Sequence, residues 1–154
     1  MEISILFLPL IASIISGFFG KMIGDRNSEI VTSLLVSISA LFSIFVLYQV
    51  IVNQYEENIV IATWINSGSL DVNWSMLIDP LSAVMLVVVT SVSALVHIYS
   101  IGYMSHDPHK PRFMAYLSLF TFAMLMLVTS DNFIQLFFGW EGVGLCSYFL
   151  IGFW

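Results

Sequence analysis

Long apolar runs separated by short polar segments make up most of this chain. A run of about 17 to 25 apolar residues has the length needed to cross the hydrocarbon core of a bilayer as a helix. Five such runs predict five transmembrane helices, over Ile3–Gly20, Ile30–Val52, Leu81–Met104, Phe113–Ser130 and Asn132–Trp154. The expected fold class is therefore an all-α polytopic membrane protein.

The segment between the second and third runs follows a different period. Apolar and polar residues alternate over Leu70–Met76, which is typical of a strand with one apolar face. Ile59–Ile65 is rich in β-branched residues, and Asn66–Ser69 supplies turn-forming residues. This pattern predicts one β-hairpin on the outer membrane surface. It would serve either as a docking element for a neighbouring subunit or as a lid over its own helix ends.

Composition agrees with a lipid environment. Hydrophobic residues make up 59% of the chain and charged residues 9%, whereas soluble domains carry about 25% charged residues. A net charge of −6 with four Lys and Arg residues leaves no basic patch for phosphates, so nucleic acid is excluded as a partner. The single cysteine, Cys146, permits no internal disulfide and is expected to be a small buried hydrophobe.

The cations predict how the chain is oriented in the membrane. Lys21 and Arg26 lie between the first two runs, and Lys110 and Arg112 lie between the third and fourth. Because short loops rich in Lys and Arg stay on the cytoplasmic side, both loops are expected inside and Met1 outside. We therefore expect helices one and two over residues 1–52, an extracytoplasmic hairpin loop over 53–80, and helices three to five over 81–154.

Glu141 is the first candidate functional residue. It lies near the middle of the last apolar run, where a carboxyl group is costly and normally serves an ion or proton pathway. Ile134, Phe138, Gly144 and Tyr148 share its helical face. No Lys or Arg lies inside any of the five runs. Glu141 is therefore expected to stay protonated or to meet a cation on a further helix. The alternative is a neutral glutamic acid that only links two helices.

His97 is the second candidate for proton translocation. Histidine titrates near neutral pH and can relay protons, but a single histidine beside Tyr99, Ser100 and Tyr103 fits an interhelical hydrogen bond equally well. The segment 106–110 offers three conceivable metal ligands around Pro108, yet a solvated turn is the stronger expectation. No catalytic, cofactor-binding or metal-binding residue is predicted in this chain.

Several segments resemble one known family. The sequence is similar to the amino-terminal part of chain 5 of NADH:ubiquinone oxidoreductase (respiratory complex I), called chain L in bacteria. The resemblance is specific from Asp79 onward and strongest in GWEGVGLCSY, residues 139–148. The matching segments are Asp79–Ser82, Ser93–Met104, Leu119–Leu125, Asn132–Phe137, Gly139–Tyr148 and Ile151–Trp154.

The resemblance implies the amino-terminal part of an antiporter-like, proton-translocating subunit of NADH:ubiquinone reductase. It implies no redox centre in this chain, with NADH, FMN, iron–sulfur clusters and quinone held by other subunits. Its implied partners are the other membrane subunits, the lipid bilayer and protons, in a bacterial inner membrane or a mitochondrial inner membrane. Glu141 matches the family's glutamate on the fifth helix, which is paired with a lysine on a later helix that this chain does not contain.

Two other functions fit part of the pattern. The large subunit of a multi-subunit sodium/proton antiporter shares the Trp-Glu and Ser-Tyr pairs, although Gly142–Cys146 favours complex I. A non-catalytic membrane scaffold would need no ionisable group at position 141. Replacement of Glu141 by glutamine separates the scaffold from both proton-translocating functions.

Overall fold

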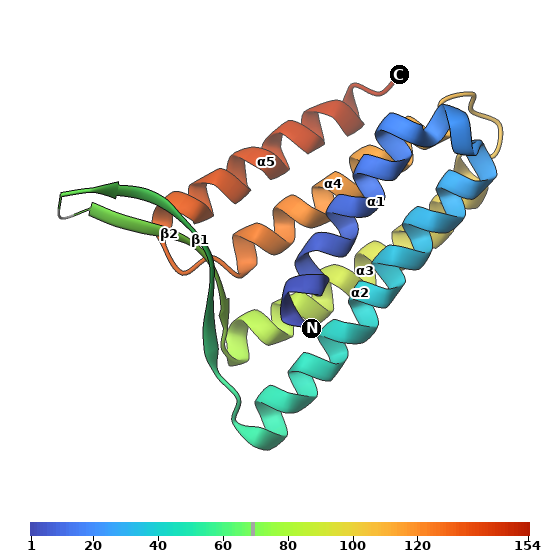
Figure 1. Cartoon of the computed structure of the whole chain (residues 1–154). Helices are drawn as coiled ribbons and strands as arrows, with labels where there is room; N and C mark the ends of the chain where they lie inside the picture. The colour runs from blue at the N-terminus through green and yellow to red at the C-terminus, as the bar shows by residue number, and fades with distance from the viewer. Residues whose placement is uncertain (69) are drawn as a thin grey trace.

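The computed structural model describes residues 1–68 and 70–154. Over these residues the chain forms five helices and one hairpin (Figure 1). In chain order they are α1 (Glu2–Ile23), α2 (Asp25–Asn53), β1 (Glu57–Ser67), β2 (Leu70–Ile78), α3 (Pro80–Tyr103), α4 (Lys110–Val128) and α5 (Phe133–Ile151). All five helices are long and apolar enough to cross a membrane. The predicted multi-pass fold with one hairpin is thus confirmed.

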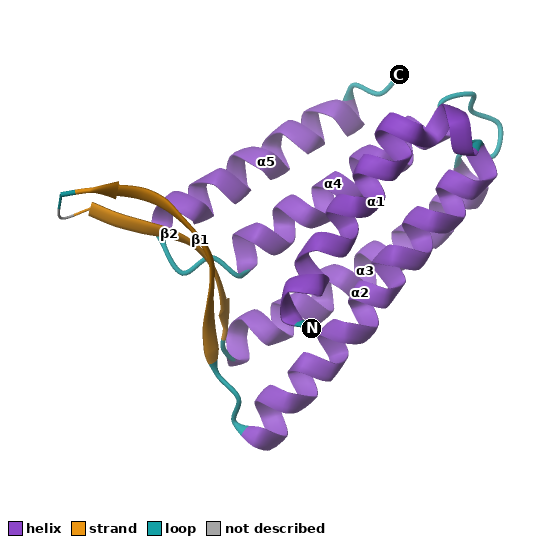
Figure 2. Ribbon diagram, viewed as in Figure 1, coloured by secondary structure: helices purple, strands orange, loops and turns teal. Residues whose placement is uncertain are grey.

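The helices form a bundle organised around α4, which contacts the other four. α1 and α2 pack against each other, α2 also packs against α3, and α5 packs against α4. The amino terminus and the hairpin lie at one end of the bundle. The carboxyl terminus and the α1–α2 and α3–α4 connections lie at the other end (Figure 2). We call these the hairpin end and the opposite end.

Local side-chain chemistry explains where two of the helices begin. Before α3, the Asp79 carboxylate accepts the Ser82 N–H at 2.6 Å, and the Ser82 hydroxyl oxygen accepts the Asp79 N–H at 2.8 Å. This reciprocal cap satisfies two backbone donors. Before α5, the Asn132 side chain accepts the Gln135 N–H at 2.8 Å.

The second helix is longer than the sequence pattern predicted. The apolar run begins at Ile30, but α2 begins at Asp25, directly after Gly24. Gly24 has a φ of 90°, a conformation open to glycine that lets the chain reverse sharply after α1. Because the turn is this short, Glu29 belongs to the helix and not to a loop.

Small residues and hydroxyl groups join the helices. A Cβ at Gly20 would lie 2.5 Å from the Pro111 Cβ, and one at Gly139 would lie 2.8 Å from the Leu127 backbone, so both positions require glycine for close approach. Short hydrogen bonds add to this packing. They join Ser39 Oγ to the Ile5 carbonyl, Ser16 Oγ to the Pro111 carbonyl and Ser43 Oγ to Thr90 Oγ1, each at 2.7 Å.

The hairpin is antiparallel, with Glu57 opposite Ile78 and Ser67 opposite Leu70. The predicted turn over Asn66–Ser69 was therefore too wide, because Asn66 and Ser67 pair within the ladder. Gly68 reverses the chain with a φ of 60°, and Ser69 lies outside the described residues. Leu70 was predicted on the apolar face but is exposed at the tip.

The hairpin covers the ends of its own helices. Met76 and Ile78 are fully buried in a core with Ile5, Leu6 and Leu125. The Leu77 N–H donates to the Thr129 carbonyl at 2.8 Å. This packing supports the lid interpretation. The tip projects beyond the bundle in Figure 1, so docking of a neighbour stays a prediction.

Side chains of α5 hold the middle of the hairpin. The buried Gln135 side chain accepts the Ser75 N–H at 2.9 Å and donates to the Ser75 carbonyl at 2.7 Å. Trp64 and Trp74 from the hairpin meet Phe138 from α5, with ring centroids 4.9 to 5.8 Å apart. These contacts fix the start of α5 against the hairpin.

Candidate functional site

Glu141 is the ninth residue of α5 and lies at the centre of that helix. Its side chain is exposed in the described chain, which corrects the expectation that it is buried. The reason is the phase of the helix. α5 turns Gln135, Gly139 and Cys146 toward the bundle, and position 141 lies 200° around the helix from position 139.

The surroundings of Glu141 form an uncovered helical face. Ile134, Phe138 and Tyr148 are 37%, 45% and 72% exposed, and nothing lies within 4 Å of a Cβ built at Gly144. Gly142 instead faces α4, where its Cβ would lie 3.2 Å from the Ala123 Cβ. Among residues 1–68 and 70–154, no charged side chain pairs with Glu141. An ionisable group on an apolar face is the arrangement expected for a carboxyl that another helix covers.

His97 lies on the opposite side of α4, in the interface between α3 and α4, and is fully buried. Its Nδ1 lies 2.8 Å from the Ser93 carbonyl oxygen, and its Nε2 lies 3.0 Å from Ser118 Oγ. Because a carbonyl oxygen only accepts, Nδ1 carries the hydrogen and Nε2 of the neutral ring accepts the Ser118 hydroxyl. Both nitrogens are thus engaged. This geometry is that of an interhelical hydrogen bonder.

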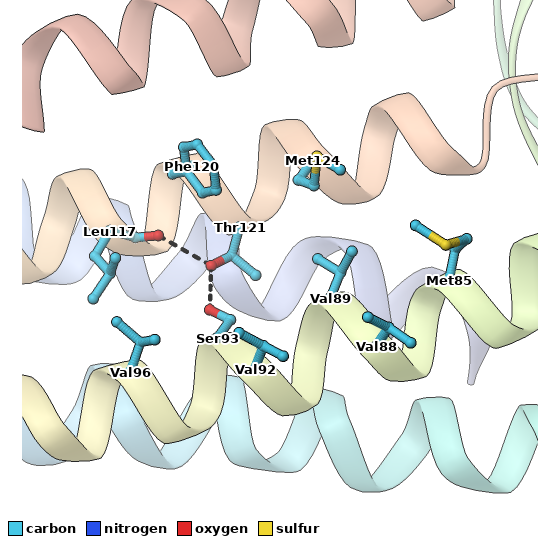
Figure 3. A pocket seen from close by; sticks show the side chains of 10 residues that line it. All are labelled: Met85, Val88, Val89, Val92, Ser93, Val96, Leu117, Phe120, Thr121 and Met124. Atoms are coloured by element: carbon cyan, nitrogen blue, oxygen red, sulfur yellow. Dashed lines mark hydrogen bonds between the residues drawn. The ribbon is translucent and has the colours of Figure 1, made fainter.

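A cavity of about 390 Å³ opens beside this interface (Figure 3). Valine side chains of α3 and Leu117, Phe120 and Met124 of α4 line it. Its polar groups are the hydroxyls of Ser93 and Thr121, which hydrogen-bond to each other. Such a lining offers water few partners. The cavity therefore does not provide a wet route toward His97.

A buried glutamate lies instead at the opposite end of the bundle. Glu29 is 5% exposed, and its Oε1 lies 3.9 Å from Lys110 Nζ at the start of α4. The sequence reasoning missed this residue because the apolar run begins one position later. The signal was present, since Glu29 begins a helical stripe with Ser33, Val36 and Ala40, all of which are buried.

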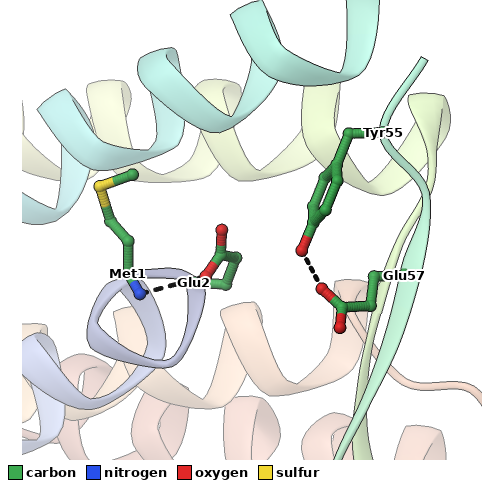
Figure 4. A network of polar contacts seen from close by, with 4 residues as sticks. All are labelled: Met1, Glu2, Tyr55 and Glu57. Atoms are coloured by element: carbon green, nitrogen blue, oxygen red, sulfur yellow. Dashed lines mark hydrogen bonds and ion pairs between the residues drawn. The ribbon is translucent and has the colours of Figure 1, made fainter. Parts of the chain in front are cut away.

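Other carboxylates have local partners. At the hairpin end, Glu2 pairs with the amino group of Met1 at 3.1 Å, and Glu57 accepts a hydrogen bond from the Tyr55 hydroxyl (Figure 4). In the connection between α4 and α5, Asp131 accepts hydrogen bonds from Asn58 at 2.9 Å and from Asn132 at 2.6 Å. Burial opposes ionisation of Asp131, but these hydrogen bonds outweigh it and lower its pKa.

The segment 106–110 forms the predicted turn. Asp107 accepts the His109 N–H at 2.7 Å through one oxygen and the Trp154 indole N–H at 2.7 Å through the other. The hydrogen bond from Trp154, together with that from His109, lowers the pKa of Asp107. Over residues 1–68 and 70–154, no three His, Cys, Asp or Glu side chains group as a metal site needs. Cys146 is buried against the bundle, as expected.

Comparison with known proteins gives one family. The matching family model is described as the N-terminus of NADH-ubiquinone oxidoreductase (complex I) chain 5, and it matches residues 64–114. Proteins named NADH-ubiquinone oxidoreductase chain 5 are similar along the whole chain. Those of Arabidopsis thaliana and Marchantia polymorpha are 55% and 56% identical over 154 residues, and that of Phytophthora infestans is 55% identical over 152.

The chain therefore corresponds to the amino-terminal part of chain 5. It spans 23% of the length of these curated relatives and is covered at 99 to 100% of its own length. Chain 5 was the family indicated by the residues from Asp79 onward, so that interpretation is confirmed. The match includes α5, and with it Glu141 on the uncovered face.

Proposed function

We propose that this chain forms the amino-terminal part of a membrane subunit of the proton-pumping NADH:quinone oxidoreductase, in which Glu141 carries protons. The position of Glu141 supports this most directly. A carboxyl at the centre of an apolar helix would be costly in lipid, and α4 packs on the other face of α5. A cationic side chain from a further helix on the Glu141 face would compensate its charge and let it exchange protons.

The other parts of the proposal follow from the same family. Two helices over residues 1–52 and the hairpin over 53–80 precede the start of an antiporter-like domain over 81–154. The hairpin lies on the outer surface. The subunit takes part in NADH:ubiquinone reduction without a redox group of its own. NADH, FMN, iron–sulfur clusters and quinone bind to other subunits. Its surroundings are the other membrane subunits and the lipid of a mitochondrial or bacterial inner membrane.

Glu141→Gln in the full-length subunit tests this function. The substitution keeps the size of the side chain and removes its ionisation. NADH-driven proton uptake by native membrane vesicles should fall to a small fraction of the wild-type rate. Electron transfer from NADH to an artificial acceptor should persist and report an assembled enzyme. The matched control is Glu57→Gln, which removes a hairpin carboxylate hydrogen-bonded to Tyr55 and should leave proton uptake unchanged.

Two outcomes would contradict the proposal. Normal proton uptake by the Glu141→Gln enzyme would support the scaffold function, because a scaffold does not need an ionisable group at this position. Uptake that depends on sodium and continues without NADH or quinone would support the sodium/proton antiporter instead.

We propose His97 as a second, subordinate proton-carrying residue. The burial of an ionisable ring in the α3–α4 interface supports a role in proton transfer. Both ring nitrogens, however, already form hydrogen bonds with serine groups. His97→Gln distinguishes the alternatives. A relay residue would lower proton uptake while the thermal stability of the enzyme stays unchanged. An interhelical hydrogen bonder would lower stability while proton uptake per enzyme is retained.

A further inference from the structure

The end of the bundle opposite the hairpin contains buried polar atoms without partners. Glu29 Oε1, Ser28 Oγ and Ser33 Oγ are buried and accept or donate no hydrogen bond among the described residues. All three lie within two turns of α2. Buried polar atoms of this kind are few in native proteins, and ordered water is a common partner. Three of them so close together indicate a place that binds water.

The distance between the Glu29 carboxylate and the Lys110 ammonium also fits a pair bridged by a water molecule. Glu29 Oε1 and Lys110 Nζ are 3.9 Å apart, which is beyond the 2.7 to 3.2 Å of a direct N–H to oxygen hydrogen bond. Their side chains are 6% and 20% exposed. A water molecule that accepts from the ammonium and donates to the carboxylate fits such a separation.

Three helices meet around this pair. Ser28 Oγ lies 3.5 Å from a Cβ built at Gly20 of α1, and the same Cβ would lie 2.5 Å from Pro111 of α4. Lys110 directly precedes Pro111. The ion pair therefore lies where α1, α2 and α4 converge, next to the close contact between Gly20 and the Pro111 ring.

A cavity of about 370 Å³ lies next to this point. Its ionisable lining residues are Lys21, Asp25, His109 and Arg112. Asp25 precedes Glu29 by one turn of α2, and His109 and Pro111 flank Lys110, so the cavity lies beside the ion pair, although neither Glu29 nor Lys110 lines it. With these polar groups in its lining, the cavity is suited to hold water close to the ion pair.

We propose that Glu29 and Lys110, together with Ser28 and Ser33, form a hydrated proton-exchange site at this end of the bundle. The site lies on α2 and the start of α4, whereas Glu141 lies on α5. The proposed site is separate from Glu141, and the proposal does not depend on the function assigned to Glu141. The charged groups that act on Glu29 are Lys110 on α4 and Asp25 and Arg26 on its own helix. Lys21, His109 and Arg112 line the neighbouring cavity.

Infrared difference spectra between acidic and neutral pH test the proposal in the full-length subunit within its native assembly. Protonation of Glu29 should give a carboxyl stretching band that shifts in deuterated water. Glu29→Gln should abolish this band, and the matched control Asp25→Asn, one turn away on the same helix, should retain it. Lys110→Gln should move the midpoint of the band by about 1–3 pH units toward higher pH, because an adjacent ammonium favours the carboxylate. Lys110→Arg should restore the midpoint.

Several results would overturn the proposal. They are a band that persists in Glu29→Gln, a band that disappears in Asp25→Asn, or a midpoint that does not move in Lys110→Gln. The last result is decisive even if Glu29→Gln does not fold, since Lys110→Gln keeps the carboxyl group. Glu141→Gln must retain the band. Loss of proton pumping in Glu141→Gln with the Glu29 band intact would show that protonation of Glu29 does not depend on Glu141.

Discussion

The contact between α4 and α5 depends on the absence of a side chain at Gly139, and Gly139→Ala tests this. A Cβ at this position would lie 2.8 Å from both the N and Cα atoms of Leu127. Ordinary carbon contacts lie at about 3.5 to 4.0 Å. The two backbones would therefore have to separate by about 1 Å, because the atoms that block the methyl group belong to a rigid helix. Overpacking of this kind costs about 1–3 kcal/mol.

Gly144→Ala on the same helix is the matched control, because nothing lies within 4 Å of its Cβ position. Both substitutions gain about 0.5–1 kcal/mol of helix propensity. The difference between the two variants therefore isolates the packing cost, and Gly139→Ala should be less stable by about 1–3 kcal/mol. Thermal or denaturant unfolding of the 154-residue chain in detergent, in which position 144 stays uncovered, measures this difference.

The same pair of variants tests how α5 positions Glu141. Glu141 follows Gly139 by two residues, so a displaced helix moves the carboxyl group relative to any helix that covers it. Gly139→Ala should lower proton uptake of the full-length subunit as well as the stability of the 154-residue chain, whereas Gly144→Ala, which meets no described atom of this chain, should be the more stable of the two variants. Equal stability of the two variants would refute the argument that backbone contact fixes α5 at this position.

Three further results are expected at the hairpin end. Gln135→Leu should leave the N–H and carbonyl of Ser75 unpaired, at about 1–3 kcal/mol for each buried group, and proteolysis of the hairpin should become faster. The hydrogen bonds that lower the pKa of Asp131 stabilise the fold above its ordinary pKa of about 3.9. That contribution is lost as the pH falls through the lower folded value, so hairpin proteolysis should rise in acid but stay level with pH in Asp131→Asn. Asp79→Ala removes the reciprocal cap with Ser82 and should lower the unfolding free energy by about 1 kcal/mol.

Hydropathy predicted the helices because lipid requires a continuous apolar segment of fixed length. It did not predict their ends equally well. The second apolar run begins at Ile30, after Glu29, yet the helix already begins at Asp25 because Gly24 reverses the chain just before it. The hairpin turn was similarly too wide. Asn66 and Ser67 are turn-forming by type, but cross-strand pairing with Asp71 and Leu70 extends the ladder through them.

At the candidate site around Glu141, helical periodicity predicted which residues share a face but not which face packs in the bundle. Helical periodicity correctly grouped Glu141 with Ile134, Phe138 and Tyr148, since residues on one face follow from geometry alone. Periodicity does not specify which face meets α4. That choice depends on Gly139 and Gly142, where the backbones of α4 and α5 approach each other. The contacts of Gln135 could not be predicted from the sequence either, because its partner Ser75 lies sixty positions away.

His97, Glu29 and Glu141 differ in how completely their polar atoms are satisfied, and this difference bears on function. Both nitrogens of His97 have serine partners within 3.0 Å. A proton that moved through the ring would have to break one of these bonds in a dry interface. Glu29 has an ammonium 3.9 Å away and an oxygen without a hydrogen bond, and Glu141 has an uncovered face. A carboxyl group whose oxygens are not saturated by fixed donors can change protonation state without disrupting helix packing. By this criterion the two glutamates are better suited than the histidine to exchange protons.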